Sequence, residues 1–147
     1  MKKVLLVDGH SIANRAFYGV PMLSNTQGIY TNAVYGFINI LLKTIETEQP
    51  THLAVAFDQK APTFRHKMYE EYKGTRKGMP EELHAQIPLI QEFLRLAGIQ
   101  VILQEGIEAD DILGTLGKRE AAGGAEVAVL SGDRDLLQLA EEHLRIL

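Results

Sequence analysis

The sequence contains no cysteine among its 147 residues, and it has no long hydrophobic run. Without cysteine it can form neither a disulfide framework nor a thiolate metal site, and an intracellular protein is the default expectation. No apolar stretch approaches the ~20 residues that a membrane-spanning helix needs, so we expect no membrane partner. The N-terminal MKKVLLVDGHS has two lysines, but Asp8 interrupts its apolar part too early for a signal peptide. We interpret this stretch as a buried strand.

Several catalytic motifs are also missing. No GxxxxGK[ST] segment is present, VDGHS is not followed by GxGxxG, and nothing resembles a GxSxG elbow. A phosphatase with an aspartyl nucleophile would need a second acid two residues after Asp8, and His10 occupies that position. The five histidines are scattered without metal-ligand spacing, so we expect surface or packing roles for them, although His10 adjoins Asp8.

The composition is that of one soluble globular domain, with 46% apolar and 23% charged residues. The net charge of −4 hides an asymmetry, because residues 60–77 carry six Lys or Arg against two Glu. That local charge of +4 leaves −8 for the rest of the chain. The basic segment is either a solvated charged loop or a polyanion-binding segment beside a cation-binding body.

Four short runs are continuously apolar, as expected for parallel strands that are covered on both faces. They are residues 2–8, 51–58, 99–104 and 125–133, and residues 144–147 begin a further strand. Helical apolar spacing occurs between them, over residues 31–49, 80–98, 108–124 and 134–143. This alternation predicts an α/β domain with a mainly parallel central sheet flanked by helices.

Local signals add detail to this plan. Thr31 or Asn32 can cap the first predicted helix, and Gly98 can end the second. Pro88 lies inside the second helix, which predicts a kink or a break there. The basic stretch 59–80 is too long for an ordinary strand-to-helix loop, and loops of that length are usually functional or mobile.

Acidic residues end or follow each of the four apolar runs, at the carboxyl edge where open α/β sheets bind ligands. Any one of them could instead cap a helix or serve a turn, contributing ~0.3–1 kcal/mol. Together on one rim they would repel one another unless a divalent cation neutralised them. Oxygen ligands alone suit Mg²⁺ or Mn²⁺. The seven candidate metal ligands are Asp8, Asp58, Glu108, Asp110, Asp111, Asp133 and Asp135.

Five segments together resemble one known family. LVDGHSIANRAF, THLAVAFD, TFRHKMYEEYKGTR, GIEADDILGTL and LSGDRDLLQL occur in order and at family-like spacing over essentially the whole chain. They resemble the 5′-nuclease domain of bacterial DNA polymerase I, a member of the flap-endonuclease family whose fold is related to the PIN nucleases. The resemblance implies a PIN-like fold with a basic helical-arch insertion, which stretch 59–80 matches.

The resemblance also implies an activity, namely 5′→3′ exonuclease and structure-specific 5′-flap endonuclease hydrolysis of DNA phosphodiesters with two Mg²⁺ or Mn²⁺ ions. The seven acids match the metal ligands of the family by position. The implied partners are DNA flaps, nicks and single-stranded 5′ ends in the bacterial cytoplasm, at the nucleoid. No protein partner can be inferred.

Basic and aromatic residues of the chain match DNA contacts of the family. Lys73 and Arg76 match residues that reach the scissile phosphate and stabilise developing charge. Tyr72 is placed to stack on a base, worth ~1–3 kcal/mol in stacking systems. Arg65 and Arg15 resemble phosphate contacts, with an ordinary surface position as the alternative.

The chain also departs from the family pattern. Family members continue with further aspartates for the second metal and with a helix–hairpin–helix module that grips duplex DNA. We therefore expect residues 1–147 to be the N-terminal portion of a 5′-nuclease domain, with an incomplete second metal site and weak duplex binding. Two alternatives stay open, a PIN-like ribonuclease and a non-catalytic nucleic-acid-binding remnant. YKGTR favours the flap family, and the seven acids favour retained chemistry.

Overall fold

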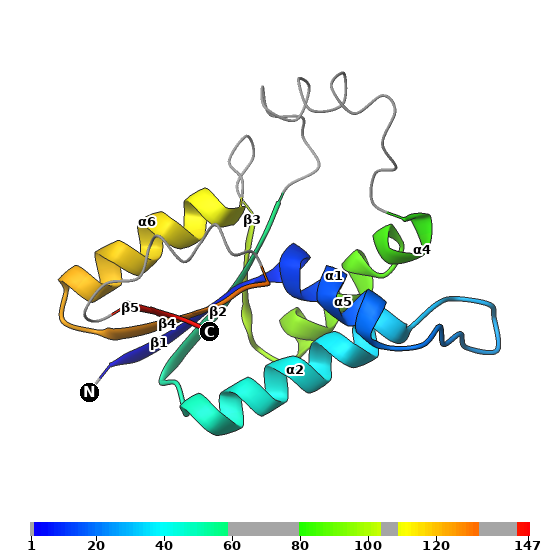
Figure 1. Ribbon diagram of the computed structural model, residues 1–147, viewed down its shortest axis with the longest axis horizontal. Helices are drawn as coiled ribbons and strands as arrows, with labels where there is room; N and C mark the ends of the chain where they lie inside the picture. Colours follow the sequence, from blue (N-terminus) through cyan, green and yellow to red (C-terminus); the bar gives the residue numbers. More distant parts are fainter. Residues whose placement is uncertain (1, 59–79, 104–108, 133–143) are drawn as a thin grey trace, which may run out of the picture.

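The computed structural model describes residues 2–58, 80–103, 109–132 and 144–147. In this part of the chain, five strands form one sheet in the order β3-β2-β1-β4-β5, and every neighbouring pair is parallel (Figure 1). The predicted parallel sheet is confirmed. The strands are β1 Lys3–Asp8, β2 His52–Phe57, β3 Gln100–Leu103, β4 Glu126–Leu130 and β5 Leu144–Ile146.

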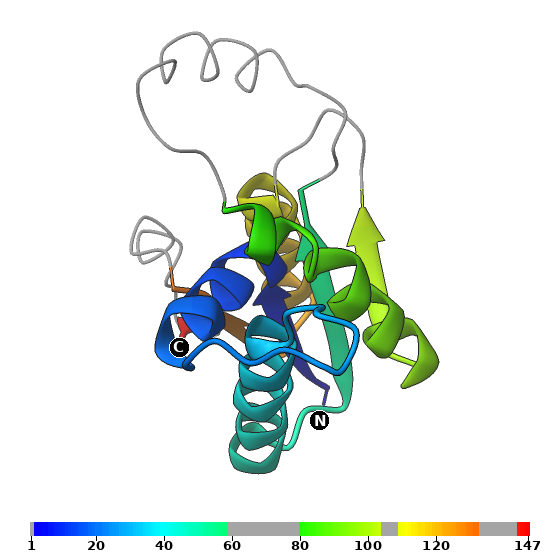
Figure 2. The same ribbon diagram turned by 90° about the vertical axis from the view of Figure 1, so that its right-hand side faces the viewer.

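Helices cover both faces of the sheet, as Figures 1 and 2 show. One face carries α1 Gly9–Gly19, α2 Asn32–Glu48, α4 Glu81–His84 and α5 Ile87–Leu96, and the other carries α6 Ala109–Ala122. The fold is therefore a three-layer arrangement with helices on either side of a parallel sheet.

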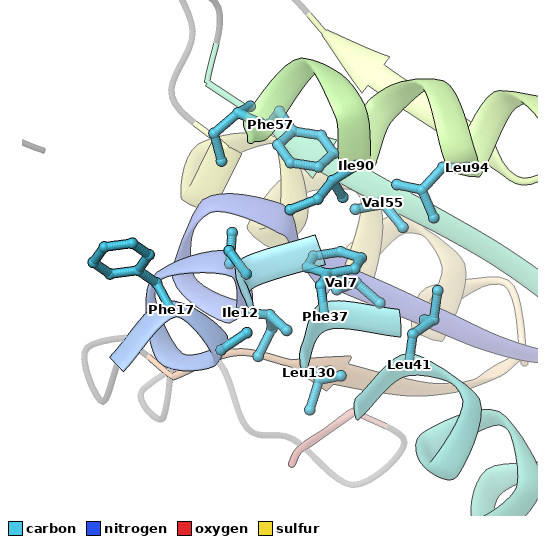
Figure 3. Packing of buried hydrophobic residues seen from close by; sticks show 14 of the residues in the cluster. Val7, Ile12, Phe17, Phe37, Leu41, Val55, Phe57, Ile90, Leu94 and Leu130 are labelled. Atoms are coloured by element: carbon cyan, nitrogen blue, oxygen red, sulfur yellow. The ribbon is translucent and has the colours of Figure 1, made fainter. Parts of the chain in front are cut away.

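Alternate residues of each central strand enter different cores. Leu5 and Val7 of β1 pack with α1, α2 and α5, whereas Val4 and Leu6 belong to the core beneath α6. Figure 3 shows Ile12, Phe37 and Ile90 from three helices close to the sheet residues Val7 and Val55. Full burial of such a side chain stabilises the fold by roughly 1.5–3 kcal/mol, which explains why these strands are continuously apolar.

The break predicted at Pro88 is confirmed. Helix α4 ends at His84, and α5 begins at Ile87 with Pro88 in its first turn. A proline costs no helical hydrogen bond there, because the first N–H groups of a helix have no partner within it. Gly98 ends α5 with φ of +77°, in the left-handed region that glycine adopts without strain.

One helix was not anticipated. Residues 9–19 form α1, although the stretch after Asp8 begins with Gly-His-Ser, a composition typical of turns. Its apolar residues Ile12, Ala13, Ala16 and Phe17 are all buried, so packing overrides the weak local signal.

Two predicted features fall outside the description. They are the helix over residues 134–143 and the basic stretch 59–80, apart from Pro80. Among the helices that the structure does describe, none is long and apolar enough to cross a membrane.

A candidate site at the carboxyl edge of the sheet

The strand order reverses between β1 and β4, the position at which open α/β sheets form a crevice. The chain runs from β1 outward to β2 and β3, then crosses to β4 on the other side of β1. The connection through α1 and α2 covers one face, and the crossover helix α6 covers the opposite face. In open α/β sheets, ligands bind at the carboxyl ends of the strands where the order reverses in this way.

Asp8 is the last residue of β1 and lies at this reversal of the strand order. Although it is charged, only 7% of its surface is exposed. Its Oδ1 accepts a hydrogen bond from the backbone N–H of Ser11 over 3.3 Å and so caps α1. Its Oδ2 accepts a hydrogen bond from Ser131 Oγ over 3.2 Å. The carboxylate is therefore held from both sides of the crevice.

Ser11 also contacts the end of β4. Its Oγ accepts a hydrogen bond from the backbone N–H of Gly132 over 2.6 Å and lies 3.4 Å from Ser131 Oγ. A Cβ on Gly132 would lie 2.9 Å from that oxygen, so a side chain at this position would require Ser11 to move. The first turn of α1 and the exit of β4 are thus fitted closely to each other.

The second predicted acid, Asp58, directly follows β2 and is exposed. Its backbone N–H donates a hydrogen bond to His10 Nδ1 over 3.1 Å, and its Oδ2 lies 3.8 Å from the same nitrogen. Because Nδ1 accepts from the backbone, the histidine ring is in its neutral form with the proton on Nε2. The contact between carboxylate and ring is therefore not an ion pair in this form.

Burial lowers the pKa of His10 below its ordinary value. The Asp58 carboxylate acts to raise this pKa, and His84 lowers it further. The ring packs edge-on against Phe57, with the centroids 5.4 Å apart. The histidines were expected at the surface or in packing roles. His10 packs against Phe57 and in addition accepts the hydrogen bond from the Asp58 N–H.

Of the other predicted site residues, the structure describes the side chains of two and the backbone of a third. Asp111 is exposed in the first turn of α6, a helix that begins beside the carboxyl end of β2 (Figures 1 and 2), and Arg15 is exposed on α1. Asp110 lies in α6, but its side chain is outside the description. The remaining candidates lie outside the described residues altogether, namely Glu108, Asp133, Asp135, Arg65, Tyr72, Lys73 and Arg76.

Within the described residues, no three His, Asp or Glu side chains are grouped so that they could hold a metal ion. Asp8, Asp58 and Asp111 are the candidate ligands whose side chains are described, and four more would have to contribute. The convergence of all seven acids therefore stays a prediction. Asp8 ends β1 and Asp58 directly follows the neighbouring β2 at the same edge, as expected.

Sequence reasoning missed Ser11 and Ser131. The available signal was the position of each residue at the end of its strand. Val7 of β1 pairs with Leu130 of β4, and Asp8 and Ser131 are the next residues along the two strands. Residues one step beyond such a pair lie side by side in parallel strands. No composition or spacing rule singles out a serine in this position.

Comparison with known proteins then decides the family. Residues 3–147 match the model of the family described as "5′-3′ exonuclease, N-terminal resolvase-like domain". The chain belongs to this family. Within this 5′-3′ exonuclease family, it is 53% identical over 145 residues to DNA polymerase I of Bacillus subtilis, covering 99% of this chain and 16% of the polymerase. It is 42% identical over 147 residues to the 5′-3′ exonuclease of Aquifex aeolicus, covering 100% and 51%.

Solved structures show the same fold. A bacteriophage T5 flap endonuclease in complex with DNA and metal ions superposes with a TM-score of 0.67 at 17% identity, covering 98% of this chain and 54% of that one. At this identity the likeness concerns the fold, and it confirms the PIN-like 5′-nuclease architecture. This exonuclease-family chain spans about half the length of the Aquifex relative and about a sixth of the polymerases.

Proposed function

We propose that the chain is the catalytic sheet of a metal-dependent 5′ nuclease that hydrolyses DNA phosphodiesters at 5′ ends and 5′ flaps. Family membership supports this proposal, as do a relative called 5′-3′ exonuclease and a structural neighbour that holds DNA and metal ions. The proposal covers the activity and substrate of the whole protein, of which this chain matches a part.

The observation that carries the proposal is the setting of Asp8. A carboxylate is expensive to bury, yet Asp8 is almost fully buried at the strand-order reversal. As an ordinary helix cap it would need the Ser11 N–H alone, but it also accepts from Ser131 on the opposite strand. A carboxylate that is oriented by two elements at a ligand-binding crevice is suited to coordinating a cation.

The donor set fits Mg²⁺ or Mn²⁺. Asp8, Asp58 and Asp111 offer only carboxylate oxygens, which are the ligands that these hard cations prefer. We propose that Glu108, Asp110, Asp133 and Asp135 complete the set. When bound, the ions would lower the pKa of a coordinated water molecule and stabilise the attacking and leaving oxygens of the displacement.

The cationic residues have a separate role in this proposal. Lys73 and Arg76 would neutralise the scissile phosphate as negative charge develops on it. Arg65, Tyr72 and the exposed Arg15 would hold the strand by phosphate contacts and base stacking. In the proposed domain plan, stretch 59–80 is the arch that carries four of these five residues.

The experiment is cleavage of a 5′-labelled DNA flap with Mg²⁺ or Mn²⁺, beside an RNA flap of the same sequence. Asp111→Ala should abolish the cuts. Glu46→Gln is the matched control, because Glu46 is exposed near the end of α2, which leads into the amino edge of the sheet.

Metal-dependent DNA cuts that persist in Glu46→Gln and vanish in Asp111→Ala would support the proposal. Preferential cutting of the RNA flap would replace it with a ribonuclease function. Metal-independent binding of DNA without cuts would leave the chain a nucleic-acid-binding module.

A further inference from the structure

We propose that Ser131 is a positioning residue for the metal-binding carboxylate of Asp8. This inference rests on the proposed function, since it assigns Asp8 to a cation. It adds a residue from the opposite strand of the crevice, whose role is to fix the direction in which the carboxylate oxygens point.

The two oxygens of Asp8 are held by two different elements. Oδ1 accepts from the backbone N–H of Ser11 in α1, over 3.3 Å, and Oδ2 accepts from Ser131 Oγ at the end of β4, over 3.2 Å. The terminal torsion of an aspartate is otherwise broad, so one contact alone would leave the carboxylate free to rotate. Two donors on opposite sides define its plane.

The direction of the serine hydroxyl follows from counting protons. An ionised carboxylate only accepts, and a hydroxyl carries one proton, so the proton of Ser131 points to Asp8. Ser11 Oγ lies 3.4 Å from Ser131 Oγ and accepts from the Gly132 N–H over 2.6 Å. Gly132, Ser11 and Ser131 therefore form one polar network with Asp8, in which Ser131 donates to the carboxylate.

Burial makes this arrangement specific. Ser131 and Asp8 are each 7% exposed, so water has little room to replace the hydroxyl. A carboxylate has about four acceptor sites, so a hydrogen bond from Ser131 does not exclude coordination of a cation by the same group. Partners that orient a metal ligand typically contribute about 10–100-fold to metal affinity or activity.

The test is a Mn²⁺ titration of the full chain after removal of metal by EDTA, followed by thermal unfolding. Ser131→Ala should raise the Mn²⁺ concentration at half-maximal stabilisation by about 10–100-fold. The Mn²⁺ dependence of DNA-flap cleavage should shift in the same direction, and saturating Mn²⁺ should recover the rate with KM for DNA unchanged.

The matched control is Thr51→Val, which removes a hydroxyl at the other end of β1. Thr51 Oγ1 accepts from Lys3 N over 2.9 Å and donates to Lys3 O over 3.0 Å, far from the carboxyl edge. This variant should lower the melting temperature of the metal-free protein and leave the Mn²⁺ midpoint where it is. A purely structural role of Ser131 would give the same pattern as Thr51→Val.

The outcomes separate the two levels of inference. If the wild type responds to Mn²⁺ and the midpoint of Ser131→Ala is unchanged, Ser131 does not position Asp8 and the inference is overturned while the proposed function stands. If the wild type shows neither Mn²⁺-dependent stabilisation nor cleavage, the proposed function fails and this inference fails with it.

Discussion

The backbone N–H of Asp58 donates a hydrogen bond to Nδ1 of His10 over 3.1 Å, joining the end of β2 to the first turn of α1. This bond requires the neutral ring, because a protonated imidazole has no acceptor nitrogen. Burial lowers the pKa of His10 in the same sense, with His84 adding to the effect and the Asp58 carboxylate opposing it. The fold therefore selects neutral His10.

The first prediction concerns the pH dependence of stability. The folded pKa of His10 lies below that of the unfolded chain, about 6.5, so below that pH the unfolded state binds more protons. The stability contribution of neutral His10 should be complete above that pH and should be lost as the pH falls through the folded pKa. Urea unfolding between about pH 8 and about pH 5 should show a steeper loss in the wild type than in His10→Gln.

The matched control for this pH series is His52→Gln, since His52 is exposed at the start of β2. It should keep the pH slope of the wild type. Equal slopes in the wild type and His10→Gln would contradict the assigned state of His10.

The second prediction concerns Gly9. A Cβ at this position would lie 2.5 Å from the ring of Phe57, closer than real Cβ contacts allow. Phe57 is fully buried and also contacts Phe37, with the rings stacked at 6.4 Å between centroids. Gly9→Ala should therefore destabilise the protein by about 1–3 kcal/mol, as expected for an overpacked core, measured by urea unfolding.

Gly19→Ala provides the comparison within the same helix. Gly19 is the last residue of α1, and a Cβ there would meet nothing within 4 Å. This variant should be neutral or more stable by about 0.4–1 kcal/mol, because alanine restricts the unfolded chain. Equal losses for the two variants would show that the contact with Phe57 does not decide the cost at Gly9, because alanine is the better helix former at both positions.

The strands could be predicted from the sequence because their signal is local. Continuous apolar runs mark strands buried on both faces, and the runs around Leu5 and Val129 coincide with β1 and β4. The break at Pro88 could be predicted for the same reason, since proline acts on its own helix. Helix α1 could not, because its formation depends on packing of Ile12 and Ala16 beneath other elements.

The strand-end positions of Asp8 and Asp58 could be predicted, but their contacts could not. Strand ends supplied Asp8 and Asp58, since the carboxyl ends of parallel strands share one edge. The contact of Ser131 with Asp8 spans 123 residues of sequence and depends on which strand lies beside β1. Strand order is set by the packing of whole elements, so no local pattern could reveal this contact.

The third prediction concerns Gln86, which is fully buried between α4 and α5. The side chain of Thr31, which precedes α2, makes no capping hydrogen bond. Gln86 Oε1 takes this role by accepting from the N–H groups of Ala33 and Val34, over 2.7 and 3.1 Å. Its Nε2 donates to Asn32 Oδ1 over 2.9 Å and to a backbone carbonyl of α4 over 3.0 Å. The amide therefore satisfies four polar groups.

Gln86→Met keeps the volume and removes these hydrogen bonds. We expect a loss of about 2–4 kcal/mol in the free energy of unfolding, because buried donors and acceptors are left without partners. Gln27→Met, at an exposed position, should change it by less than about 0.5 kcal/mol. A small loss for Gln86→Met would mean that water enters and replaces the amide.

The last prediction separates the structural from the metal-binding role of Asp8. Asparagine caps helices about as well as aspartate, and its Oδ1 can accept from the Ser11 N–H as the carboxylate does. Asp8→Asn should therefore keep the stability of the metal-free protein within about 1 kcal/mol, whereas Asp8→Ala should lose about 0.5–2 kcal/mol through the missing cap. Both variants should lose Mn²⁺-dependent stabilisation and DNA cleavage, because a neutral amide is a poor ligand for a hard cation. Full Mn²⁺-dependent stabilisation and cleavage in Asp8→Asn would mean that Asp8 acts as a cap alone, and the cation would have to be held by other acids of the edge.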